Sequence, residues 1–154
     1  MEASDVKYKV IATDTIAVER FKGKSPKNYS EIVEEAEKFI VHYLKEFIEE
    51  AMTDRKHKEY LKDYLDELDS SVLIVPGLGR YRNWEFKGQL SLFYLYSFLH
   101  LIKELVEYKP EEIWLDLSHG VNYMPTLTYR VVRKIMEALS LEFHDVELKL
   151  FNSD

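Results

Sequence analysis

The chain alternates between short apolar runs with the spacing of β-strands and longer segments with the spacing of helices, and this alternation limits its fold most. Strands are predicted over 8–14, 71–75, 112–117 and 144–151, and helices over 31–51, 53–69, 90–106 and 125–140. Strands separated by helices form mostly parallel sheets, because each crossover returns the chain to the same end of the sheet. We therefore predict an α/β fold with a mostly parallel sheet, helices on both faces and an edge strand at the C-terminus.

Length and charge narrow the class of protein. The chain has 154 residues, 46% of them hydrophobic, and is predicted to form a single domain over 1–154. A net charge of −7 argues against binding long nucleic acid but leaves room for a small anion in a local pocket. No apolar run reaches the roughly 18 residues of a membrane span, and the N-terminus lacks a signal-peptide pattern, so we expect a cytoplasmic protein without membrane contact. The absence of Cys excludes disulfides and thiolate metal sites, and the Lys and Glu content is typical of thermophilic proteins.

The first long helix is predicted to begin at Ser30, whose hydroxyl suits an N-cap. Its apolar residues repeat with helical spacing and form one broad stripe, so we expect them to be buried. They are Ile32, Val33, Ala36, Phe39, Ile40, Tyr43, Leu44, Phe47 and Ile48.

The helix over 90–106 is apolar nearly all round, which predicts two packing partners. The side chains expected against the sheet are Leu90, Phe93, Tyr94 and Leu101. Those left for a second partner are Leu92, Leu95, Leu99 and Ile102. Either a second copy of the chain or the helix over 53–69 covers this second group, and a symmetric homodimer is the simpler solution.

The strand over 112–117 runs through a polar turn into a helix that starts near Pro125, where a proline suits the first helical turn. Backbone N–H groups at such a junction bind anions. The other predicted parallel strands end at Asp14 and at the segment Pro76-Gly-Leu-Gly79. Ligands bind outside the carboxyl ends of parallel strands, so we expect these ends to meet at one rim.

Residues from two of these ends are the predicted ligand-binding set. They are Gly77, Leu78, Gly79, Arg80, Ser118, His119, Gly120, Val121, Asn122, Tyr123 and Met124. Glycines allow close approach of the backbone to a ligand, although a Gly-x-Gly is also a common strand exit. Ser118 and Asn122 offer polar groups for a base or ribose. The cations Arg80, Arg82 and Lys87 either attract an anion or are simply solvated.

Three phrases of the sequence match a known family. Asp116-Leu-Ser-His-Gly-Val-Asn-Tyr-Met-Pro125, with Pro76-Gly-Leu-Gly79 before it and Leu150-Phe-Asn-Ser-Asp154 after it, resembles the CARF domain, the CRISPR-associated Rossmann fold, of Csx-type proteins. The resemblance implies a Rossmann-like homodimer that binds cyclic oligoadenylate, commonly cyclic tetra-adenylate, in type III CRISPR defence. Family members usually begin with a further strand and continue past the last phrase, so we expect a truncated or split domain. This leaves open whether a separate chain supplies the missing strand or an effector.

Catalysis is less clearly indicated. In the family the ligand activates a HEPN ribonuclease domain, whose Arg and His lie a little more than one helical turn apart; Arg55 and His57 are too close together, so this activity is not expected from the chain. One alternative is a ring nuclease with His119, near Asp116, as acid or base, although a His at a strand exit is more often structural. Another is a dimerisation module without ligand. The other histidines are scattered, so neither a metal nor a cofactor is predicted.

Overall fold

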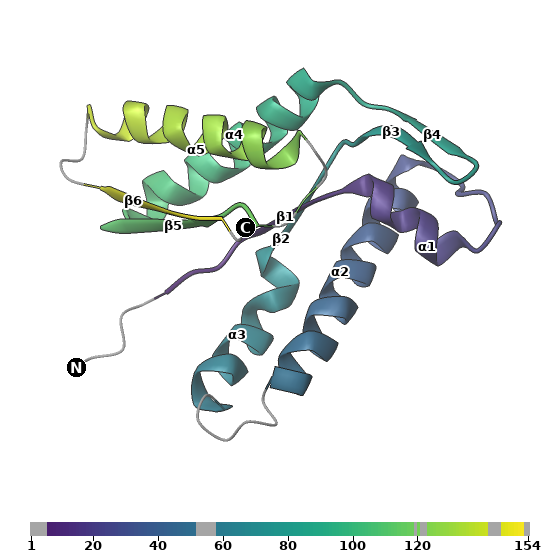
Figure 1. The fold of residues 1–154 in the computed structure, drawn as a ribbon, viewed down its shortest axis with the longest axis horizontal. Helices are drawn as coiled ribbons and strands as arrows, with labels where there is room; N and C mark the ends of the chain where they lie inside the picture. The colour runs from purple at the N-terminus through teal and green to yellow at the C-terminus, as the bar shows by residue number, and fades with distance from the viewer. Residues whose placement is uncertain (1–5, 52–57, 119, 121–122, 142–145, 153–154) are drawn as a thin grey trace. The chain divides into compact units, whose positions relative to one another are not determined.

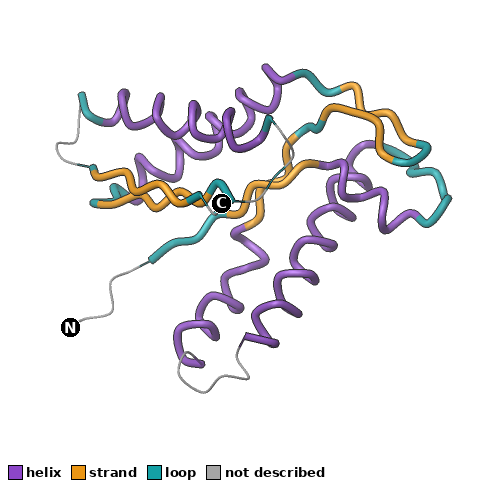
Figure 2. The backbone as a smooth tube through the Cα atoms, in the orientation of Figure 1, coloured by secondary structure: helices purple, strands orange, loops and turns teal. Residues whose placement is uncertain are grey.

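The computed structural model describes residues 6–51, 58–118, 120, 123–141 and 146–152 (Figures 1 and 2). The chain divides into two compact units, residues 1–87 and 88–154. Helices and short strands alternate, and two of the strand pairs are parallel, which confirms the predicted α/β class. The prediction of one domain across both units stays a prediction. None of the described helices is long and apolar enough to cross a membrane.

The first unit contains a parallel pair of strands, β1 (Val10–Thr13) and β2 (Val72–Val75). Their register sets Thr13 opposite Val75, so the chain leaves both strands at the same end. Between them lie four helical elements: η1 (Asp14–Ala17), α1 (Val18–Phe21), α2 (Tyr29–Ala51) and α3 (Lys58–Ser71). Asp14 was predicted to belong to the strand and residues 15–21 to no helix or strand; residues 14–21 are helical, and Ala17, Val18 and Phe21 on them are all buried.

Two apolar clusters hold α2 in the first unit. Ala36 packs with Ala17 and Phe21 near the start of α2, and Val41 and Ile48 pack with Leu68 of α3 further along. The described neighbours of α2 cover only part of its predicted apolar stripe. Tyr43 and Phe47, which were expected to be buried, are 58% and 61% exposed.

The start of α2 also differs from the prediction. Its N-cap is Asn28, whose Oδ1 accepts the N–H of Glu31 at 2.9 Å. The Glu31 carboxylate accepts the N–H of Lys27 at 2.6 Å, so two donors are satisfied reciprocally. Ser30, the predicted cap, lies inside the helix.

An antiparallel hairpin stands where a loop was expected. It consists of β3 (Leu78–Tyr81) and β4 (Trp84–Lys87), with Tyr81 opposite Trp84. Aromatic contacts support it, because Trp84 stacks on Phe86 and also packs against Phe21 of α1. Strands of only four residues that contain Gly and Arg give little periodic signal.

The second unit contains α4 (Leu90–Tyr108), β5 (Glu112–Asp116), α5 (Met124–Leu139) and β6 (Glu147–Phe151). β5 and β6 form a parallel pair with Leu115 opposite Leu150. α4 and α5 pack together (Figure 1). The buried side chains of these two helices include Phe93, Ser97, Leu101, Val131, Val132, Ile135 and Leu139.

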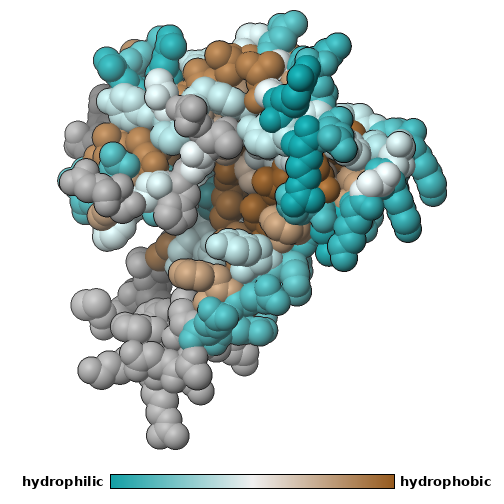
Figure 3. Space-filling view, turned by 45° about the vertical axis from the view of Figure 1, so that its right-hand side comes forward, coloured by the Kyte–Doolittle hydropathy of each residue, from teal (hydrophilic) through white to brown (hydrophobic). Residues whose placement is uncertain are grey.

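The opposite side of α4 faces solvent in the single chain. Leu92, Leu95 and Leu99 of the predicted second group are exposed. Leu90 was predicted to face the sheet, yet it is 43% exposed, because it is the first residue of α4. Hydrophobic residues reach the molecular surface beside hydrophilic ones in Figure 3 as well.

Candidate functional site

The turn after β5 starts with two fixed backbone amides. The N–H of Leu117 donates to the carbonyl oxygen of Phe151 at 2.8 Å, which extends the strand pairing. The N–H of Ser118 donates to Oδ1 of Asp116 at 2.8 Å, an interaction that closes a tight turn. The Ser118 amide is therefore engaged with Asp116, and amides open to an anion must lie further along the chain.

Gly120 lies closer to the helix and has a backbone that other residues rarely adopt. Its φ is +136°, and a Cβ at this position would lie 3.3 Å from Cβ of Met124 and 3.4 Å from Cδ of Pro125. The backbone at residue 120 therefore lies directly against the first turn of α5. The positive φ favours glycine there, and a Cβ would in addition press on Met124 and Pro125.

The start of α5 is built from Tyr123 and Met124. Tyr123 is the N-cap residue, and its ring meets Phe93 edge-on with centroids 5.8 Å apart. Met124 is buried, so its side chain belongs to the core and its backbone is the part available to a ligand. Among the described residues no side chain caps this helix. An uncapped helix start carries a partial positive charge, which favours a negatively charged group there.

Three of the predicted site residues, His119, Val121 and Asn122, lie outside the described residues. Their predicted roles as acid or base, backbone donor and polar reader therefore stay predictions.

The other predicted segment, 77–80, begins with a residue held in place. Gly77 is buried, and its N–H donates to Oδ1 of Asp14 at 2.7 Å. Beyond it, Leu78, Gly79 and Arg80 form most of β3, and the side chains of Leu78 and Arg80 are exposed. Gly79 has a φ of +131° and lies against the Tyr81 ring. Residues 78–80 are thus a strand that starts from a fixed point.

The cations of the hairpin all have carboxylate neighbours. Arg82 contacts Glu19 at 2.7 Å, while Arg80 and Lys87 lie 3.8 and 3.5 Å from Glu85. These pairs are exposed, and exposed pairs contribute little stability. The Arg80 pair is the longest of the three.

The carboxyl group of Asp14 is held by two donors from distant parts of the chain. Besides the Gly77 amide, the Tyr29 hydroxyl donates to its Oδ2 at 2.9 Å. Burial raises the pKa of Asp14 above its ordinary value, and the hydrogen bonds from Gly77 and Tyr29 act in the opposite direction. The first strand was predicted to end at Asp14; it ends one residue earlier, at Thr13, and Asp14 begins η1. The bond between Asp14 and Gly77 is a link that sequence reasoning missed.

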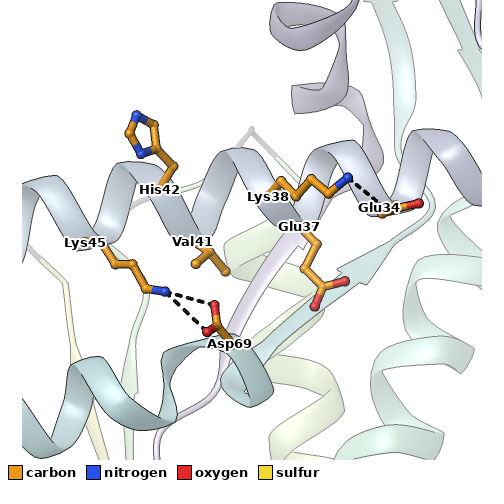
Figure 4. A pocket seen from close by; sticks show the side chains of 7 residues that line it. All are labelled: Glu34, Glu37, Lys38, Val41, His42, Lys45 and Asp69. Carbon is orange, nitrogen blue, oxygen red and sulfur yellow. Dashed lines mark hydrogen bonds and ion pairs between the residues drawn. The ribbon is translucent and has the colours of Figure 1, made fainter.

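A hollow of about 440 Å³ on α2 and α3 contains none of the predicted site residues (Figure 4). Lys38 pairs with Glu34 at 2.7 Å, and Lys45 reaches from α2 to Asp69 of α3 at 3.1 Å. Its cations are already paired, and carboxylates outnumber lysines, so it is a poor anion site. The described residues contain no cluster of three or more metal-ligating side chains of the His, Cys, Asp and Glu types.

Comparison with known proteins identifies the family. The family model for the CARF domain of the CRISPR system endoribonuclease Csx1 matches residues 2–154. The chain is also 35% identical over 105 residues to the CRISPR system endoribonuclease Csx1 of Methanocaldococcus jannaschii, an alignment that covers 64% of this chain and 22% of the relative. The chain thus matches about a fifth of the length of that relative. It belongs to the Csx1 CARF-domain family, whose fold is Rossmann-like.

Proposed function

We propose that this CRISPR-associated sensor domain binds cyclic oligoadenylate, with cyclic tetra-adenylate as the expected form. The observation that carries the proposal is the start of α5. There the glycine turn at Gly120 lies against a helix whose first turn has no side-chain cap among the described residues. A phosphate of the ligand would accept hydrogen bonds from these amides. Ser118 and Asn122 would contact the base or ribose, and residues 77–80 would supply further backbone contacts.

The same proposal includes a homodimer. Leu92, Leu95 and Leu99 form an exposed apolar row on α4, and burying such a row against its symmetry mate removes it from water. A cyclic ligand with repeated nucleotides suits a two-fold axis, because each copy can contact an equivalent part of the ring. One ligand per dimer is the expected stoichiometry.

Calorimetry tests the binding. Cyclic tetra-adenylate is titrated into the protein, with linear tetra-adenylate as the ligand control. Gly120→Ala should weaken binding about tenfold or more, because alanine at positive φ costs about 1–3 kcal/mol of strain and displaces the turn. Gly23 also has a positive φ, +87°, and open space around it, so Gly23→Ala is the matched control and should bind as the wild type does. Folded protein that shows no binding at micromolar ligand would contradict the proposal and favour a dimerisation module.

A ring nuclease is the second candidate function, on the basis of His119 in the same turn. Incubation of the cyclic ligand with the protein, followed by chromatography, separates it from a pure sensor. Loss of the cyclic species that His119→Ala abolishes would favour the nuclease. Ligand recovered intact after hours would favour the sensor.

A further inference from the structure

We propose that Asp14 is a positioning residue that holds the backbone of Gly77 and thereby sets residues 77–80 for ligand binding. The proposal rests on the proposed function, since it assigns a role within the same site. Asp14 itself is 2% exposed and is therefore not a ligand contact.

The link between Asp14 and Gly77 follows from the strand pairing. β1 and β2 are parallel with Thr13 opposite Val75, so the residues that follow them leave the sheet side by side. Asp14 is the first residue after β1, and Gly77 comes two residues after the end of β2. The 2.7 Å hydrogen bond between them joins two strand exits that lie 63 residues apart in sequence.

The second carboxylate oxygen is tied to α2. The hydroxyl of Tyr29, the first residue of α2, donates to Oδ2 at 2.9 Å. Each oxygen of the carboxyl group thus binds a different segment, and the side chain cannot rotate away from Gly77 without losing both bonds.

Among the described residues this carboxyl group has no cationic partner, and only hydrogen bonds from Gly77 and Tyr29 favour its ionised form. The neighbouring hydroxyls of Thr13 and Thr15 bond to each other at 2.6 Å. Burial of a carboxyl group without a cation is costly. In its ionised form the carboxyl group offers the Gly77 N–H a strong acceptor, since hydrogen bonds to an ionised oxygen are stronger than neutral ones.

Close packing around Gly77 leaves no room for a side chain, not even a methyl group. A Cβ at Gly77 would overlap Cγ2 of Thr15, and it would lie 2.9 Å from Oδ1 of Asp14. The backbone that continues into β3, with the exposed side chains of Leu78 and Arg80, therefore starts from a point that Asp14 determines.

The test combines ligand affinity with an NMR signal of the anchor. Asp14→Ala removes the acceptor, so the Gly77 amide resonance should shift and the affinity for cyclic tetra-adenylate should fall about tenfold or more. Asp14→Asn keeps an oxygen for Gly77 and a polar group for Tyr29, so it should restore affinity to within about threefold of the wild type. Asp66→Ala, which removes an exposed carboxylate of α3, is the control and should change neither measurement.

Circular dichroism shows whether Asp14→Ala folds. If it does not, Tyr29→Phe carries the test, because it removes one hydrogen bond from an exposed ring; it should shift the Gly77 resonance and lower affinity about two- to fivefold. An unchanged resonance and affinity in that variant would refute the positioning role.

The remaining outcomes separate this inference from the proposed function. Wild-type protein that binds no cyclic tetra-adenylate refutes the proposed function and, with it, the role of Asp14 in ligand binding. Wild type and folded Asp14→Ala that bind with equal affinity refute the positioning role alone.

Discussion

Asp14 is the only ionisable side chain among the described residues that is buried. Burial opposes ionisation of its carboxyl group and raises its pKa, whereas the hydrogen bonds from Gly77 and Tyr29 favour the ionised form. The same contact explains the glycine at position 77: its backbone N–H donates to the Asp14 carboxyl group, and a side chain would collide with Thr15 and Asp14. At the scale of single residues the segment 77–80 therefore starts from a contact between one carboxyl group and one glycine.

The raised pKa of Asp14 predicts a specific pH dependence of stability. The folded state binds this proton more tightly than the unfolded state, so the stability that comes from the group is present below the usual aspartate pKa and is lost as pH rises through the raised value. Asp14→Asn lacks this contribution. Denaturant unfolding between pH 3 and 7, in about unit steps, should show the wild type losing stability relative to Asp14→Asn with increasing pH. A constant difference between the two proteins would show that the Asp14 pKa is unshifted.

Most elements of the fold were predictable from sequence, and the exceptions have physical reasons. β1, β2, β5 and β6 are apolar runs bounded by polar residues, and α2, α4 and α5 have long helical periods, so each was predicted to within a few residues. α1 and the two strands of the β3–β4 hairpin are equally short but mix apolar residues with charged residues or Gly, so neither an apolar run nor a period marks them. In the site, Gly77 was predicted for close approach to a ligand, whereas its described contact is the Asp14 carboxyl group. No local pattern reveals a contact that depends on strand register.

The start of α2 gives a direct comparison between the sequence prediction and the structure. Asn28→Ala should destabilise the protein by about 1 kcal/mol, because it removes the acceptor for the Glu31 amide. Ser30→Ala, at the cap predicted from sequence, should change stability by less than about 0.5 kcal/mol, because it lies inside the helix. Urea unfolding of both variants measures this, and the opposite ranking would place the cap at Ser30.

The middle of α4 contains a polar group in an apolar setting. Ser97 is fully buried, and its Oγ has no hydrogen-bond partner among the described residues. Replacing an unsatisfied buried hydroxyl with a methyl group removes its desolvation cost, so Ser97→Ala should stabilise the protein by about 1 kcal/mol. Thermal unfolding should show a midpoint raised by about 2–4 °C. A lowered midpoint would mean that the hydroxyl has a bonding role.

At the scale of the whole molecule the main question is how the exposed row on α4 is used. Side chains as apolar as Leu92, Leu95 and Leu99, adjacent on one helix, favour association in a protein whose net charge of −7 otherwise favours separation. The proposed two-fold ligand site also requires two copies. Association and ligand binding should therefore be coupled.

Leu99→Asp tests whether this face of α4 is the dimer interface. Leu99 is 54% exposed, so an aspartate there should leave the single chain folded but weaken the dimer about 100-fold or more, because it would bury an unpaired charge in an apolar interface. Ala138→Asp adds the same charge at an exposed position of α5 and is the control. Sedimentation velocity measures the assembly state, and Leu99→Asp that sediments as the wild type does would rule out this face as the interface.

The carboxyl group of Asp14 has a consequence for how this family can change over time. It joins position 14 to positions 29 and 77, which lie 15 and 63 residues further along the chain. A single substitution of the aspartate removes the acceptor of both the Gly77 N–H and the Tyr29 hydroxyl. Related sequences that carry another residue at position 14 should therefore also differ at position 29 or 77, so the three positions should be inherited as a group.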